Sequence, residues 1–140
     1  ITVSVTNADE VAPGITGGAT ASSSIAENTT AVTTLTANEA VTWSLSGGVD
    51  SALFAIDATT GALSFVSAPD FEAPNDSDTN NSYVVDVQAI DAAGNTSVQT
   101  ITVSVTNADE IAPGITGGAT ASSSIAENTT AVTTLTANEA

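Results

Sequence analysis

Apolar and polar residues alternate along much of this 140-residue chain, which is the pattern of half-buried β-strands. The clearest alternation runs through 82–90 and 98–106, whose odd positions are almost all apolar. Shorter runs predict further strands at 19–26, 31–37, 41–45, 54–56 and 63–65. Within 31–37 the phase slips between Val32 and Leu35, which predicts a β-bulge. No helical period stands out.

Turn signals separate these runs and set the fold class. They are Ser46-Gly47-Gly48, Asp57 to Gly61, and Asp91 to Asn95. Seven short strands within about 90 residues, joined by tight turns, are typical of a β-sandwich. The sequence therefore predicts an all-β fold, a seven-stranded antiparallel Greek-key sandwich.

The chain also contains a long internal repeat. Residues 1–40 and 101–140 are identical except that Val11 becomes Ile111, so the period is 100 residues. This period is about the size of one β-sandwich domain. It predicts that 1–10 is the last strand and linker of a preceding repeat and that 11–110 is one complete repeat with its linker. Residues 111–140 are then the first two strands of the following repeat, and the chain is an excerpt from a tandem array.

Composition excludes several classes of function. The chain has 16 acidic residues, no Lys, Arg or His, and a formal charge of −16. Nothing in it can neutralise phosphate, which argues against nucleic acid and anionic membrane surfaces as partners. No apolar run approaches the roughly 20 residues of a membrane span, so membrane insertion is not expected. The absence of Cys excludes disulfides, thiolate metal sites and cysteine nucleophiles.

Four acidic groups are candidates for metal binding. They are Glu27, the pair Asp70 and Glu72, the linker residues Asn107, Asp109 and Glu110, and Asp91. In a sandwich, the loops that carry the first three groups can converge at one pole. Crowded carboxylates repel one another, and Ca²⁺ with six to eight oxygen ligands relieves that repulsion. Solvated loop charges are the alternative, and Asp91 before Ala-Ala-Gly is also an ordinary turn residue.

These groups resemble the motifs of the cadherin repeat, in the bacterial form found in very large surface adhesins. Glu27-Asn28 matches the Glu-Asn after the first strand, and Asp70-Phe71-Glu72 matches the mid-domain Asp-x-Glu. Counted back from Pro113, Asn107, Asp109 and Glu110 match the acidic interdomain linker, and Asp91 to Gly94 matches the motif before the final strand. The resemblance implies Ca²⁺ held at each junction between successive domains. The repeat extends it to Asn7, Asp9, Glu10 and Glu127.

Two departures from the family pattern matter: a shortened loop lowers the expected number of ions, and a replaced linker residue lowers the negative charge at the linker. The Asp-x-Asp loop after the second strand is replaced by the short stretch 37–40, of sequence Ala-Asn-Glu-Ala, and Asn107 replaces an Asp. In the second copy, Asn138 and Glu139 are the corresponding ligand candidates. The loop from Asp76 to Asn80 resembles the start of an EF-hand but lacks Gly at the sixth place and Glu at the twelfth. It is predicted to be an ordinary loop.

The sequence thus predicts a Ca²⁺-stiffened structural module of a long extracellular stalk, fibre or adhesin. Near-verbatim repetition suits a spacer, whose length comes from copy number. Its partners would be neighbouring repeats of the same chain and sister chains in a filament. The alternative is an adhesive or self-associating module that uses the hydroxyl row of 100–106. Catalysis is not expected, because no His, Cys or Lys can act as base or nucleophile.

Overall fold

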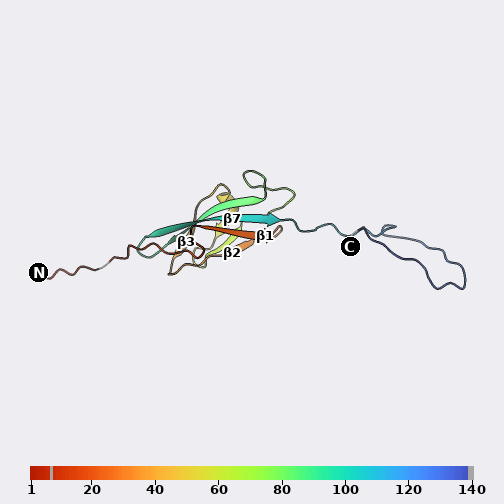
Figure 1. Ribbon diagram of the computed structural model, residues 1–140, viewed down its shortest axis with the longest axis horizontal. Helices are drawn as coiled ribbons and strands as arrows, with labels where there is room; N and C mark the ends of the chain where they lie inside the picture. The colour runs from red at the N-terminus through yellow and green to blue at the C-terminus, as the bar shows by residue number, and fades with distance from the viewer. Residues whose placement is uncertain (7, 139–140) are drawn as a thin grey trace. The chain divides into compact units, whose positions relative to one another are not determined.

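The computed structural model describes residues 1–6 and 8–138, which divide into two compact units, 1–108 and 109–140 (Figure 1). Within the described residues of the first unit there are seven strands: β1 (Thr20–Ala26), β2 (Ala31–Thr34), β3 (Thr42–Gly47), β4 (Phe54–Ile56), β5 (Ala62–Phe65), β6 (Ser82–Ile90) and β7 (Thr96–Thr106). They form a four-stranded sheet in the order β1-β7-β6-β3 and a three-stranded sheet in the order β2-β5-β4. The predicted all-β sandwich is therefore confirmed. One short 3₁₀ turn, η1 (Ser51–Leu53), was not expected.

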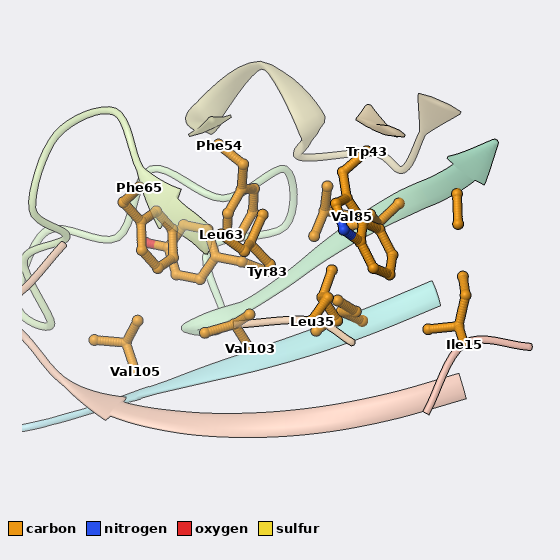
Figure 2. Close-up of a cluster of buried hydrophobic side chains, with 13 residues drawn as sticks. Ile15, Leu35, Trp43, Phe54, Leu63, Phe65, Tyr83, Val85, Val103 and Val105 are labelled. Atoms are coloured by element: carbon orange, nitrogen blue, oxygen red, sulfur yellow. The ribbon is translucent and has the colours of Figure 1, made fainter. Parts of the chain in front are cut away.

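The core lies between the two sheets. Every second residue of β6 is buried, and the inward residues of β7 face the same layer. The three-stranded sheet adds Phe54 and Phe65, whose ring centroids lie 4.4 Å apart, and Phe65 meets Tyr83 edge-on at 5.0 Å. Figure 2 shows these rings clustered together, with Trp43 in the same layer. The period-two alternation of the sequence is thus the pattern of this core.

One strand pair departs from the antiparallel expectation. β1 runs parallel to β7, with Thr20 opposite Thr100 and Ala26 opposite Thr106. Just before β1, Ile15 pairs antiparallel with Ala37, which follows β2 on the other sheet. The chain therefore crosses between sheets at Gly17-Gly18, where φ values of 94° and 83° favour glycine. Before the crossing the chain pairs antiparallel with the residues that follow β2. After the crossing it pairs with β7, which runs in the same direction as β1.

A buried glutamine fixes the crossover. Gln99 is fully buried on β7, where the alternation would place an apolar side chain. Its Nε2 donates to the carbonyl oxygens of Thr16 at 3.1 Å and Gly18 at 2.7 Å. The glycine turn thus gains two buried hydrogen bonds that replace water.

The predicted irregularity of the second strand is present. Pairing of β2 with β5 shifts register between Ala31 and Thr33, which places it at Val32, slightly earlier than the sequence pattern suggested. β2 then ends at Thr34, and the Leu35 N–H bonds to the Gly61 carbonyl at 2.9 Å. Leu35 is buried in the core although it lies outside the strand.

In the second unit the same sequence meets no partner strands. Among residues 109–138 there is no strand, only an isolated bridge between Ile115 and Ala137. Its local contacts repeat those of the first copy: Thr136 Oγ1 bonds to Thr116 Oγ1 at 2.9 Å, as Thr36 bonds to Thr16. Assignment of 1–10 and 111–140 to neighbouring repeats stays a prediction.

The two copies provide a matched test of burial. Leu35 is 8% exposed and Leu135 is 66% exposed in the same local sequence. We expect Leu35→Ala to lower the free energy of unfolding by about 2–5 kcal/mol, because a buried side chain is lost and a cavity is left. Leu135→Ala should change it by less than about 0.5 kcal/mol. Urea denaturation measures both, and equal losses would show that the second copy is packed as well.

Candidate metal sites

Three predicted carboxylates meet at one end of the sandwich. One oxygen from each of Glu27, Asp70 and Glu72 lies within 4.8 Å of the other two, and we call this group the Glu27 cluster. Glu27 directly follows β1, whereas Asp70 and Glu72 lie on the long loop between β5 and β6. The sequence prediction that these loops converge is therefore met by these three residues.

Glu27 is the buried member, only 2% exposed. Its Oε2 accepts the Phe71 N–H and its Oε1 accepts the Ala108 N–H, both at 2.8 Å. These backbone hydrogen bonds lower the pKa of Glu27 in spite of its burial, and the bond from Ala108 has the larger effect. The carboxylate thereby joins the end of β1, the β5–β6 loop and the segment that follows β7. Each oxygen retains a lone pair for a cation.

The other members are exposed and held by short-range contacts. Asp70 Oδ1 accepts the N–H groups of Glu72 and Ala73, both at 3.0 Å. Asn107 Nδ2 donates to Glu72 Oε1. In this orientation the predicted ligand Asn107 contacts the cluster as a donor to Glu72.

A second group, the Asp91 cluster, consists of Asp9, Glu39 and Asp91, again with one oxygen each within 4.8 Å. Asp91 is 7% exposed, and its Oδ1 and Oδ2 accept the backbone and side-chain N–H groups of Asn95, each at 2.8 Å. These hydrogen bonds lower the pKa of Asp91, and the bond from the Asn95 side chain has the largest effect. Asn95 Nδ2 also donates to the Asp9 carbonyl at 3.1 Å. The incoming segment is thus attached to the turn before β7.

Glu39 was missed as a ligand candidate by the sequence reasoning. The shortened stretch 37–40 was treated as a lost motif, yet it brings this carboxylate to Asp9 and Asp91. The signal was available, because Glu139 in the identical second copy was named as a candidate.

The remaining predicted ligands are less informative. Asp109 and Glu110 belong to the second unit, and Asp109 Oδ1 accepts the Ile111 N–H at 3.0 Å, a local turn contact. Asn138 Oδ1 accepts the Gly114 N–H, as Asn38 does for Gly14, which is a structural role. Glu110 is exposed, and so are two further candidates, Glu10 and Glu127. Two lie outside the described residues: Asn7 and Glu139.

The donor chemistry of both clusters suits Ca²⁺. Calcium–oxygen distances are 2.3–2.6 Å, so two ligands of one ion lie at most about 5 Å apart. Both clusters meet that limit, and all their ligand atoms are oxygens. With no basic side chain in the chain, a cation is the natural counter-charge.

Solved structures share this fold. The extracellular domain of protocadherin gamma B4 superposes with a TM-score of 0.61 at 23% identity, covering 79% of this chain and 18% of that one. The third cadherin domain of human protocadherin 7 gives 0.57 at 20% identity, covering 80% of this chain and 100% of that one. The fold is that of a cadherin domain.

Further cadherin domains share this fold. Drosophila N-cadherin domains EC1-4 give a TM-score of 0.57 at 21% identity, covering 76% of this chain and 27% of that one. The chain spans 24% of the solved fragment of protocadherin gamma B2. No family model matches it, and no curated protein matches it. Among the described residues, no helix is long and apolar enough to cross a membrane.

The duplicated glutamates allow a direct test of the Glu27 contacts. Glu27→Gln should lower the melting temperature at neutral pH in chelator. The Gln amide is uncharged, and only its oxygen can accept a backbone N–H group, whereas both carboxylate oxygens of Glu27 do so. The folded-state pKa of Glu27 is lowered, so its stabilisation is present above the unfolded value of about 4.3 and is lost as pH falls through the folded pKa.

The difference in melting temperature between Glu27→Gln and the unsubstituted protein should therefore disappear in acid. Glu127→Gln, at an exposed position with the same neighbours in sequence, should leave the melt unchanged. Thermal melts across pH measure all three proteins. A gap that stays constant in acid would contradict the assigned role of the Glu27 charge.

Proposed function

We propose that this chain is a structural repeat of a long extracellular protein, stiffened by Ca²⁺ at the ends of its cadherin-fold domain. The supporting observation is the placement of the two carboxylate clusters. Glu27 lies beside Thr106 at the end of β7, and Asp91 lies in the turn before β7 begins. Eleven residues of strand separate these ends by roughly 35 Å.

Each cluster includes or contacts the chain that enters or leaves the domain. Asp9 on the incoming segment belongs to the Asp91 cluster. On the outgoing segment, Ala108 donates to Glu27 and Asn107 donates to Glu72. Ca²⁺ bound at these carboxylates would supply the positive charge that the chain lacks. It would thereby hold both segments against the domain and limit their bending.

The partners in this proposal are neighbouring repeats of the same chain and sister chains in a filament. The near-identical copies favour a stalk, fibre or adhesin shaft of a bacterial surface protein. Extracellular modules bind Ca²⁺ with Kd values of about 10⁻⁴ to 10⁻³ M. Millimolar calcium outside a cell occupies such sites, and cytosolic calcium does not.

The alternative of an adhesive or self-associating module is less well supported. Its basis is the row of hydroxyl groups on β7, the outward face of the four-stranded sheet. Thr100 Oγ1 in that row donates to Asp86 Oδ1 on β6 at 2.6 Å. A cross-strand contact of this kind is ordinary for the solvated face of a sheet.

Calcium removal tests the proposal in the full chain. Ca²⁺ should raise the melting temperature, since a site filled at tenfold its Kd adds about 1.4 kcal/mol. Glu72→Gln and Asp9→Asn should each weaken calcium binding by roughly tenfold or more, because each removes a charged ligand from one cluster.

Asp57→Asn is the matched charge control. Asp57 Oδ1 accepts the N–H groups of Thr59 and Thr60 in a hairpin turn, remote in role from both clusters. This variant should keep wild-type calcium affinity in calorimetric titration. A melt that excess chelator leaves unchanged would refute the proposal, as would equal loss of affinity in all three variants.

A further inference from the structure

A third acidic group, Asp76 and Asp78, lies outside both clusters on the loop between β5 and β6. Asp50, from the turn before η1, is 4% exposed and anchors this loop. Its Oδ1 accepts the Ser77 N–H at 2.7 Å and its Oδ2 accepts the Val84 N–H at 2.8 Å. Asp50 therefore has a donor for each oxygen and holds the loop beside the start of β6.

Asp76 on this loop is not satisfied in the same way. It is also 4% exposed, and its Oδ2 accepts the Asn80 N–H at 2.8 Å. Its Oδ1 is buried without a hydrogen-bond partner among the described residues. Leaving a buried carboxylate oxygen without a donor or counter-charge is costly.

The group beside Asp76 is another acid. Asn80, whose N–H donates to Asp76 Oδ2, links the two residues, and interaction with the Asp76 carboxylate raises the pKa of Asp78. Asp78 Oδ2 also accepts the Asn80 Nδ2 at 2.8 Å, and Asp78 is exposed. No basic side chain exists anywhere in the chain to neutralise the pair. The loop thus combines a buried carboxylate oxygen that has no donor, on Asp76, with an exposed carboxylate two residues later, on Asp78.

We propose that the loop 76–80 binds one Ca²⁺ ion through Asp76 Oδ1 and the Asp78 carboxylate. Water and further loop oxygens would complete a coordination shell of six to eight, as Ca²⁺ tolerates irregular sets. The ion stabilises the loop that also carries Asp70 and Glu72. This site is separate from the two clusters and does not depend on their occupancy.

The single tyrosine provides a local probe. Tyr83 Oη donates to Asn75 Oδ1 at 3.1 Å, and Asn75 directly precedes Asp76. Tb³⁺ replaces Ca²⁺ at oxygen sites and emits when an excited aromatic ring lies close to it. Titrating the full chain with Tb³⁺ under tyrosine excitation should give emission that added Ca²⁺ displaces.

Asp76→Asn and Asp78→Asn should each reduce this emission at least tenfold, and each should remove one bound Ca²⁺ from the stoichiometry measured by calorimetry. Glu72→Gln is the control, because it alters the Glu27 cluster and should retain the tyrosine-excited emission. In chelator, Asp78→Asn should melt no lower than the unsubstituted protein, since it relieves repulsion. In calcium, Asp78→Asn should have a lower melting temperature than the unsubstituted protein, because a ligand of the ion is lost. A purely structural Asp78 would not give this reversal.

Two results would overturn the proposal: no tyrosine-excited emission from the folded unsubstituted chain, or emission that survives both Asp76→Asn and Asp78→Asn. If Asp76→Asn does not fold, Asp78→Asn decides alone, because Asp78 is exposed. Either negative result leaves the two clusters untested, since their occupancy is measured with Glu72→Gln and Asp9→Asn. Failure here and failure of the proposed function are therefore distinguishable.

Discussion

Sixteen acidic side chains without one basic partner are the constraint on which this structure depends. Two like charges 4 Å apart near a protein surface repel by about 4 kcal/mol, and no salt bridge can offset that here. Hydrogen bonds from backbone N–H groups offset part of this repulsion in place of salt bridges. Four acidic residues are nevertheless buried among those the structure describes: Glu27, Asp50, Asp76 and Asp91. Hydrogen bonds to N–H groups favour the charged form of a carboxylate and make this burial possible.

The same hydrogen bonds organise the loops. Glu27 receives N–H groups from the β5–β6 loop and from the segment after β7. Asp50 receives them from that loop and from β6. Each carboxylate joins segments far apart in sequence, which a Lys–Glu pair on the surface would do less rigidly. A carboxylate fixed in this way is also a preorganised cation ligand, because little conformational entropy remains to be lost on binding.

Sequence pattern predicted the strands well because period two follows directly from which residues the core buries. It did not predict features set by distant contacts. The parallel pairing of β1 depends on the Gly17-Gly18 crossover, and Asp50 is defined by its bonds to Ser77 and Val84. The sequence predicts an ordinary loop at 76–80, because glycine is missing at its sixth place and glutamate at its twelfth. Asn81 occupies the sixth place with φ of 63°, a conformation that Asn tolerates, so the missing glycine does not prevent this backbone geometry.

The duplicated segment separates what is locally encoded from what requires partners. Both copies form the same bridge and the same threonine contact, so turn chemistry alone produces these. Among the described residues, only the first copy forms strands, since β5 and β7 supply the hydrogen bonds that an isolated strand lacks. The limit of the first unit follows the same rule. It ends at Ala108, two residues beyond β7, and Ala108 is the residue whose N–H reaches Glu27. The Glu27 carboxylate therefore holds the chain against the sandwich beyond the last residue of β7.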